Sequence, residues 1–83
     1  MTIDVPTTPT SLMELLQPDN PLCDSVFLQA PVANTAEVFF GPNPAEHFLL
    51  AGSTSNYPAR SLSAMFVKAN IAGQKLIVSV ESY

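Results

Sequence analysis

The stretch that decides the fold runs from residue 64 to residue 81 and reads AMFVKANIAGQKLIVSVE. Its second half alternates, so that one face of a strand would carry Leu76, Val78 and Val80. Its first half carries a matching apolar row, Met65, Val67 and Ala69. Residues 70–74, between the two halves, include an asparagine and a glycine, which are typical of a hairpin loop. The sequence therefore predicts a β-hairpin with strands at 64–69 and 75–81.

Upstream of this hairpin, short apolar segments alternate with turn residues. The segments expected to form strands are Ser25–Ala30, Glu37–Gly41, His47–Ala51 and Tyr57–Leu62. Pro58 places the last of these at a sheet edge or a bulge. About six short strands with no helix between them are typical of an antiparallel β-sandwich or a small barrel. We therefore predict an all-β domain over residues 25–83.

Residues 1–24 have a different character and predict an extended N-terminal arm, because prolines stand among threonines and acids. One short helix is expected at 11–17, with Ser11 as its cap and Glu14 at the capping-box spacing. Its apolar stripe consists of Leu12, Leu15 and Leu16. Two turns of helix need a surface to lie on. That surface is either the sheet of the same domain or a neighbouring protein, in which case the three leucines form an interface.

The composition points to a protein that is partly covered by a partner. Apolar residues make up 47% of the 83 residues and charged residues only 12%, against about 25% in ordinary domains. A chain of this size is marginally stable alone. With one cysteine, Cys23, and one histidine, His47, neither an internal disulfide nor a Cys/His zinc site can form. Oligomerisation or docking on a larger body is the remaining source of stability.

The charge distribution argues against nucleic acid as a partner. The net charge is −4, and residues 1–59 contain six acids and no lysine or arginine. Three cations in the remainder cannot neutralise a run of phosphates. No signal peptide is expected, and no apolar run approaches the roughly 18 residues of a membrane span. We expect neither nucleic-acid nor membrane binding.

Residues that could carry chemistry are present, but not in a catalytic pattern. His47 could be combined with Ser53 or Ser55 and Asp24, yet no nucleophile-elbow motif accompanies them. Cys23 is expected to be a buried apolar residue whose thiol pKa is raised by Asp24. We therefore expect no enzyme activity, no cofactor and no metal.

The chain has more apolar strand residues than one inner face needs. The residues on the surplus face are Phe27, Phe39, Leu49, Phe66 and Ile77. Either bulges shift the phase of the strands, or part of an outer face is covered by another subunit. On the second interpretation, Phe27, Phe39 and Phe66 form the interface of the β domain.

Several segments, in order, carry a resemblance to a known group of proteins. They are VFLQA at 26–30, Asn34, VFFG at 38–41, LAG at 50–52, FVKA at 66–69 and LIV at 76–78. Together they resemble a small β domain of structural proteins from tailed bacteriophages, over about two-thirds of the chain.

The resemblance implies a virion protein without a catalytic site. The first expectation is a capsid decoration (cement) protein, assembled in the host cytoplasm, that binds the major capsid protein at subunit junctions on the head and stabilises the shell. The alternative is a head-fibre, baseplate or tail accessory protein with a β domain that binds a host surface. A homo-oligomer is expected, with a trimer as first choice because quasi-threefold positions are natural sites in a capsid lattice.

Overall fold

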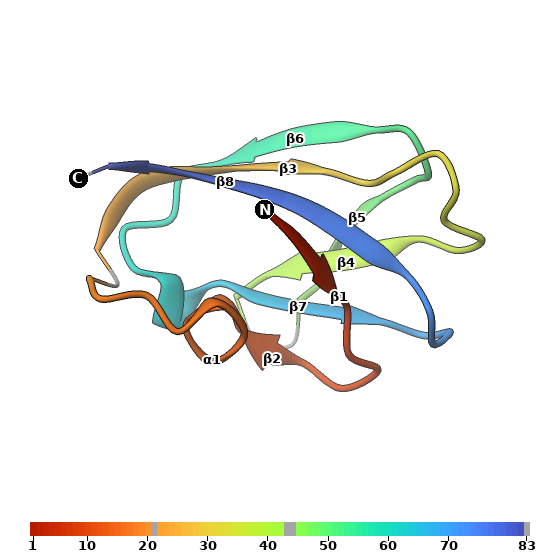
Figure 1. Cartoon of the computed structure of the whole chain (residues 1–83), viewed down its shortest axis with the longest axis horizontal. Helices are drawn as coiled ribbons and strands as arrows, with labels where there is room; N and C mark the ends of the chain where they lie inside the picture. Colours follow the sequence, from red (N-terminus) through yellow and green to blue (C-terminus); the bar gives the residue numbers. More distant parts are fainter. Residues whose placement is uncertain (21, 43–44, 83) are drawn as a thin grey trace.

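The computed structural model describes residues 1–20, 22–42 and 45–82 of the chain. Pro21 of the predicted arm, and residues 43–44 and 83 of the predicted β domain, lie outside the described residues. Two four-stranded antiparallel sheets pack face to face (Figure 1). The first sheet has the order β1 (Thr2–Asp4), β8 (Lys75–Ser82), β3 (Cys23–Gln29), β6 (Thr54–Tyr57). The second has the order β2 (Thr10–Ser11), β7 (Phe66–Ala69), β4 (Val38–Gly41), β5 (His47–Leu49). The predicted antiparallel β-sandwich is confirmed.

The core lies between the two sheets and follows the predicted alternation. The first sheet contributes buried Val26, Leu28, Leu76 and Val78, and the second contributes Val38, Phe40, Val67 and Ala69. Burial of each larger side chain stabilises the fold by about 1.5–3 kcal/mol. Leu49 also faces this core, paired with Val38, so its predicted position on the outer face was wrong.

The predicted hairpin was also wrong, although both of its strands exist. β7 belongs to the second sheet and β8 to the first, so residues 70–74 cross from one sheet to the other. Each strand has one apolar face, and that face packs on the core from opposite sides of the sandwich. Alternation identifies the buried face of a strand but does not identify its hydrogen-bonded neighbour.

The strand predicted at 57–62 begins earlier in the chain. β6 comprises the polar residues Thr54–Tyr57 and pairs with β3 at the edge of the first sheet. Pro58 ends it, because proline cannot continue a hydrogen-bond ladder. Downstream of it, Ser61 forms an isolated bridge with Leu22 and caps a short 3-10 helix, η1 (Leu62–Ala64).

The structure does not set residues 1–24 apart from the sandwich. β1 pairs with β8, β2 pairs with β7, and β3 itself begins at Cys23. The helix α1 (Leu12–Leu16) has the predicted cap, since the Glu14 amide donates to Ser11 Oγ at 3.3 Å. α1 packs on the domain's own core, as the first of the two sequence interpretations expected.

Candidate docking surfaces

The predicted interface leucines lie against the protein's own core. Leu12 is fully buried, and its amide donates to the Met65 carbonyl at 2.8 Å. Leu15 and Leu16 are half-buried and pack against the same core. Because Leu12 is fully occupied inside the domain, it cannot also contact a partner. This part of the interface prediction must be corrected.

The three predicted interface phenylalanines do not form one surface. Phe27 is in β3, and so lies on the outer face of the first sheet. Phe39 and Phe66 lie in β4 and β7, on the outer face of the second sheet. A partner that covers the second pair would therefore be on the far side of the sandwich from Phe27.

The outer face of the second sheet carries a small aromatic cluster. The rings of Phe39 and Phe48 are cross-strand neighbours with centroids 6.4 Å apart. Lys68 Nζ lies 5.5 Å from the centroid of the Phe39 ring, which is within cation–π range. Phe39 and Phe66 are each only half-exposed. The neighbouring side chains therefore already cover part of this apolar face.

A second apolar surface, which was not predicted from the sequence, lies at one end of the sandwich. The β3–β4, β5–β6 and β7–β8 loops all project from the end opposite the C-terminus (Figure 1). Each carries one exposed aliphatic side chain: Val32 is 84% exposed, Leu50 56% and Ile71 54%. We call these three residues and the loops that carry them the loop end. For Val32 and Ile71, the signal that could have revealed this surface was an apolar residue between two predicted strands.

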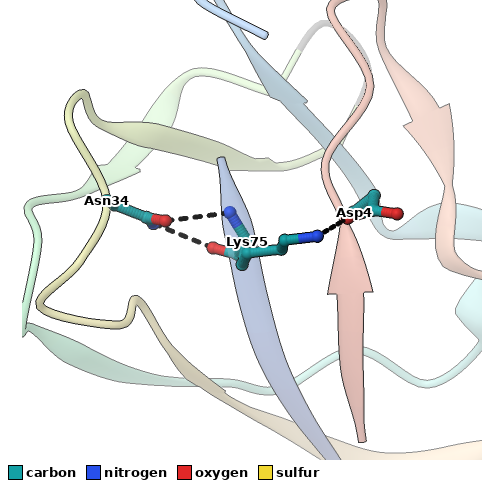
Figure 2. Close-up of polar contacts among 3 residues, drawn as sticks. All are labelled: Asp4, Asn34 and Lys75. Atoms are coloured by element: carbon teal, nitrogen blue, oxygen red, sulfur yellow. Dashed lines mark hydrogen bonds and ion pairs between the residues drawn. The ribbon is translucent and has the colours of Figure 1, made fainter. Parts of the chain in front are cut away.

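Side-chain hydrogen bonds connect the β3–β4 loop to the start of β8. Figure 2 shows Asn34 bonded twice to the Lys75 backbone: its Nδ2 donates to the carbonyl at 2.8 Å, and its Oδ1 accepts from the amide at 2.9 Å. The side chain of Lys75 in turn pairs with Asp4 of β1. The Asn34 side chain therefore makes the pair of hydrogen bonds to Lys75 that the backbone of a neighbouring strand would make.

Gln74 provides a second connection between the same loops. It is a large polar residue that is nevertheless almost completely buried, at 2% exposure. Its Oε1 accepts from the Thr35 amide at 2.8 Å and from the Ala36 amide at 3.0 Å, while its Nε2 donates to Thr35 Oγ1. A buried amide is tolerated only when it is hydrogen-bonded in this way.

The β5–β6 loop is attached to the same assembly. The Ala30 amide donates to the Ser53 carbonyl at 2.9 Å, and the Gly52 amide donates to the Ala30 carbonyl at 2.7 Å. Gly52 has φ +84°, and a Cβ added there would lie 3.2 Å from Val32 Cγ1. Hydrogen bonds therefore join all three loops and restrain their positions relative to one another. Such preorganisation lowers the ordering cost of binding.

Among the described residues, no hydrogen bond joins His47 to Ser53, Ser55 or Asp24, the polar residues considered for chemistry. The Cys23 thiol is buried and donates to the Ala59 carbonyl at 3.0 Å. Burial, and then the charge of Asp24, raises the pKa of this thiol. His47 lies among the rings of Phe40 and Tyr57, at centroid distances of 5.5 and 6.1 Å. Within residues 1–20, 22–42 and 45–82, no cluster of three or more His, Cys, Asp or Glu side chains could hold a metal.

Comparisons with protein-family models, with curated proteins and with solved structures found no match for this chain. Among the described residues, no helix has the length and apolar character needed to cross a membrane.

Proposed function

We propose that this chain is a non-catalytic virion protein that decorates the head of a tailed bacteriophage at the junctions between capsid subunits. The observation that carries the proposal is the loop end, where Val32, Leu50 and Ile71 are exposed on loops bonded to one another. Large exposed apolar side chains on a rigid support are typical of surfaces that bind other proteins. The resemblance of the strand segments to phage structural proteins supports the choice of a capsid.

Such a protein would stabilise the shell by binding to it, because binding shifts the equilibrium toward the assembled form. A ligand that binds only the closed lattice stabilises that lattice over its dissociated subunits. The low charge of the chain, 12% of its residues, suits a protein whose surface is largely covered in place. Many copies, each contributing a few kcal/mol, would reinforce the shell.

The alternative, a fibre or tail accessory protein that binds a host surface, has less support, because a sugar site usually needs an exposed aromatic ring beside polar groups. Tyr57 is half-buried, and its ring packs edge-on against Phe40 at 5.8 Å, so it is not a free platform for a sugar. The number of copies per particle separates the two functions, because decoration requires hundreds. The expected trimer stays a prediction.

Co-sedimentation with phage heads that lack the protein tests the proposal. The triple variant Val32→Ser, Leu50→Ser, Ile71→Ser should lose at least about tenfold in affinity, since each buried aliphatic side chain is worth more than 1 kcal/mol. The matched control is Phe48→Ser, which removes an apolar residue that is equally exposed but lies on the second sheet. If the triple variant binds heads as the wild type does, or if only Phe48→Ser loses binding to heads, the loop end is not the docking surface.

A further inference from the structure

The edge of the first sheet is only half covered. β8 extends from Lys75 to Ser82, but β1 pairs only with residues 75–77. The last contact is at Met1, whose carbonyl accepts from the Val78 amide at 2.7 Å and whose amino group donates to the Val78 carbonyl at 3.1 Å. Figure 1 shows the N-terminus beside the middle of β8, with the rest of the strand continuing toward the C-terminus.

Val80 therefore presents unpaired backbone groups at this edge. In an antiparallel sheet the amide and carbonyl of alternate residues point to the same side. Since both groups of Val78 point toward Met1, both groups of Val80 point to the same open side and away from β3. In the described part of the chain, they have no backbone partner on that side. Such an edge is a template for another strand.

An apolar hollow lies directly beneath this edge. Its volume is about 310 Å³, and its lining includes Met1, Leu16, Pro18, Leu62, Val78 and Val80. The side chain of Val80 has the inward parity of Val78, yet it remains 41% exposed. The hollow is therefore a place where the sandwich core is open to solvent beside an unpaired strand.

The charges around the hollow indicate the character of its occupant. Asp19 and Glu81 are exposed and directly follow the lining residues Pro18 and Val80 in sequence. Asp24, on the same strand as Val26, and Glu14 of α1 are also exposed. The positive charges here are Arg60, near the Leu22–Ser61 bridge, and the amino group of the lining residue Met1, so the four carboxylates outnumber them. The excess of carboxylates favours a basic occupant.

We propose that this edge binds an extended segment of a partner protein, which adds to the first sheet antiparallel to β8 and in line with β1. The residue of the partner segment that pairs with Val80 lies on the same face of the sheet as Val80, so its apolar side chain enters the hollow. The two flanking residues point outward, where a lysine or arginine would meet Glu81. A second copy of this chain is a poorer occupant, because pairing two β8 edges would bring together two acidic surfaces.

This proposal does not depend on the virion function, because it rests on the β8 edge and the hollow alone. Its probe is an acetylated, amidated pentapeptide of alternating lysine and valine. Hydrogen exchange of the Val80 amide in the full-length protein should slow by about tenfold when the free peptide is at ten times its Kd. The same peptide with its backbone methylated at the nitrogens that face β8 should give no protection.

Two variants separate the contributions of the ladder and the hollow. Val80→Pro removes the edge donor, and Leu16→Gln places a polar group in the hollow without touching the ladder; each should weaken peptide binding at least about tenfold. The triple loop-end variant is the matched control and should bind the peptide as the wild type does. Head binding by the triple loop-end variant tests the proposed function alone. If that variant still binds heads, the proposed function fails, but the peptide-binding result stands.

The proposal is overturned if the peptide does not protect Val80, or if the methylated peptide protects it equally. It is also overturned if the protein alone forms a concentration-dependent dimer in which the Val80 amide is protected, since a second copy would then be the occupant. Loss of binding in Leu16→Gln with retained folding, judged by far-UV circular dichroism, supports it even if Val80→Pro does not fold.

Discussion

The two ends of the sandwich present apolar surface in opposite ways. At the loop end, Val32 and its two counterparts protrude from loops that Asn34 and Gln74 bond to the body. At the other end, which we call the helix end, α1 and the C-terminal half of β8 enclose a hollow of about 310 Å³. The first surface protrudes from loops that hydrogen bonds join, whereas the second is a hollow that borders an unpaired part of a strand. A protruding surface can insert into a partner, and an open edge can receive one.

The difference has its origin in how each end satisfies its backbone. At the loop end, the side-chain oxygens of Gln74 and Asn34 accept from the Thr35, Ala36 and Lys75 amides, in place of a strand partner. At the helix end, β1 has three residues and β8 has eight, which leaves part of β8 without a neighbour on one side.

The largest effect is expected at the helix end, from Leu12→Ala. Leu12 is completely buried between α1 and the sheets, so truncation should lower the free energy of unfolding by about 3 kcal/mol. The matched control is Met13→Ala, the next residue of the helix, whose exposed side chain should contribute less than about 0.5 kcal/mol. Urea denaturation measures both. Equal stability of the two variants would mean that α1 is a detachable arm rather than part of the domain.

A smaller effect is expected at the loop end, from Gln74→Met. The apolar replacement keeps the volume but leaves the Thr35 and Ala36 amides without their acceptor, which should cost about 2 kcal/mol. Gln29→Met on the exposed side of β3 is the control and should change stability by less than about 0.5 kcal/mol. Thermal denaturation compares them. A neutral Gln74→Met would show that the loop end is not held by this side chain.

The smallest effect concerns Cys23 and reports whether water reaches the core at the helix end. Its thiol pKa is raised above 9.0, first by burial and then by Asp24, so the folded protein holds this proton more tightly than the unfolded chain does. The stability this provides is complete below pH 9.0 and is lost as the pH rises toward the folded pKa.

The matched measurement is the free energy of unfolding of the wild type and of Cys23→Ala from pH 7 to pH 10.5. The variant should be about 1 kcal/mol less stable at neutral pH, because a buried hydrogen bond is lost. This difference should shrink above pH 9. A difference that stays constant with pH would indicate a thiol with an ordinary pKa and a wet core.

Local patterns predicted much of the fold, because they depend on neighbouring residues. The alternation of Val26 and Leu28 identified the buried face of β3, and the Ser11–Glu14 spacing identified the start of α1. Strand pairing depends on contacts distant in sequence, so the partner of β8 was predicted incorrectly. The polar sequence of β6 concealed a strand that is held by pairing with β3 rather than by burial.

The candidate surfaces were harder to predict for the same reason. Val32 and Ile71 lie about forty positions apart, and their loops are brought together by the pairing of β3 with β8 and by the bonds of Asn34 and Gln74. Asparagine and glutamine in loops are common, and nothing in their local sequence indicates a distant partner. Leu12 was predicted as an interface residue but is fully buried, because an amphipathic helix reveals that it packs on something but does not reveal on what.

The most direct test of this account is amide hydrogen exchange along the free, full-length protein at neutral pH. If the loop end is closed by side-chain bonds and the helix end is open, the Thr35, Ala36 and Lys75 amides should exchange more slowly than the Val80 amide by on the order of tenfold or more. Val80 as strongly protected as Lys75 would contradict the account, because the β8 edge would then already be paired.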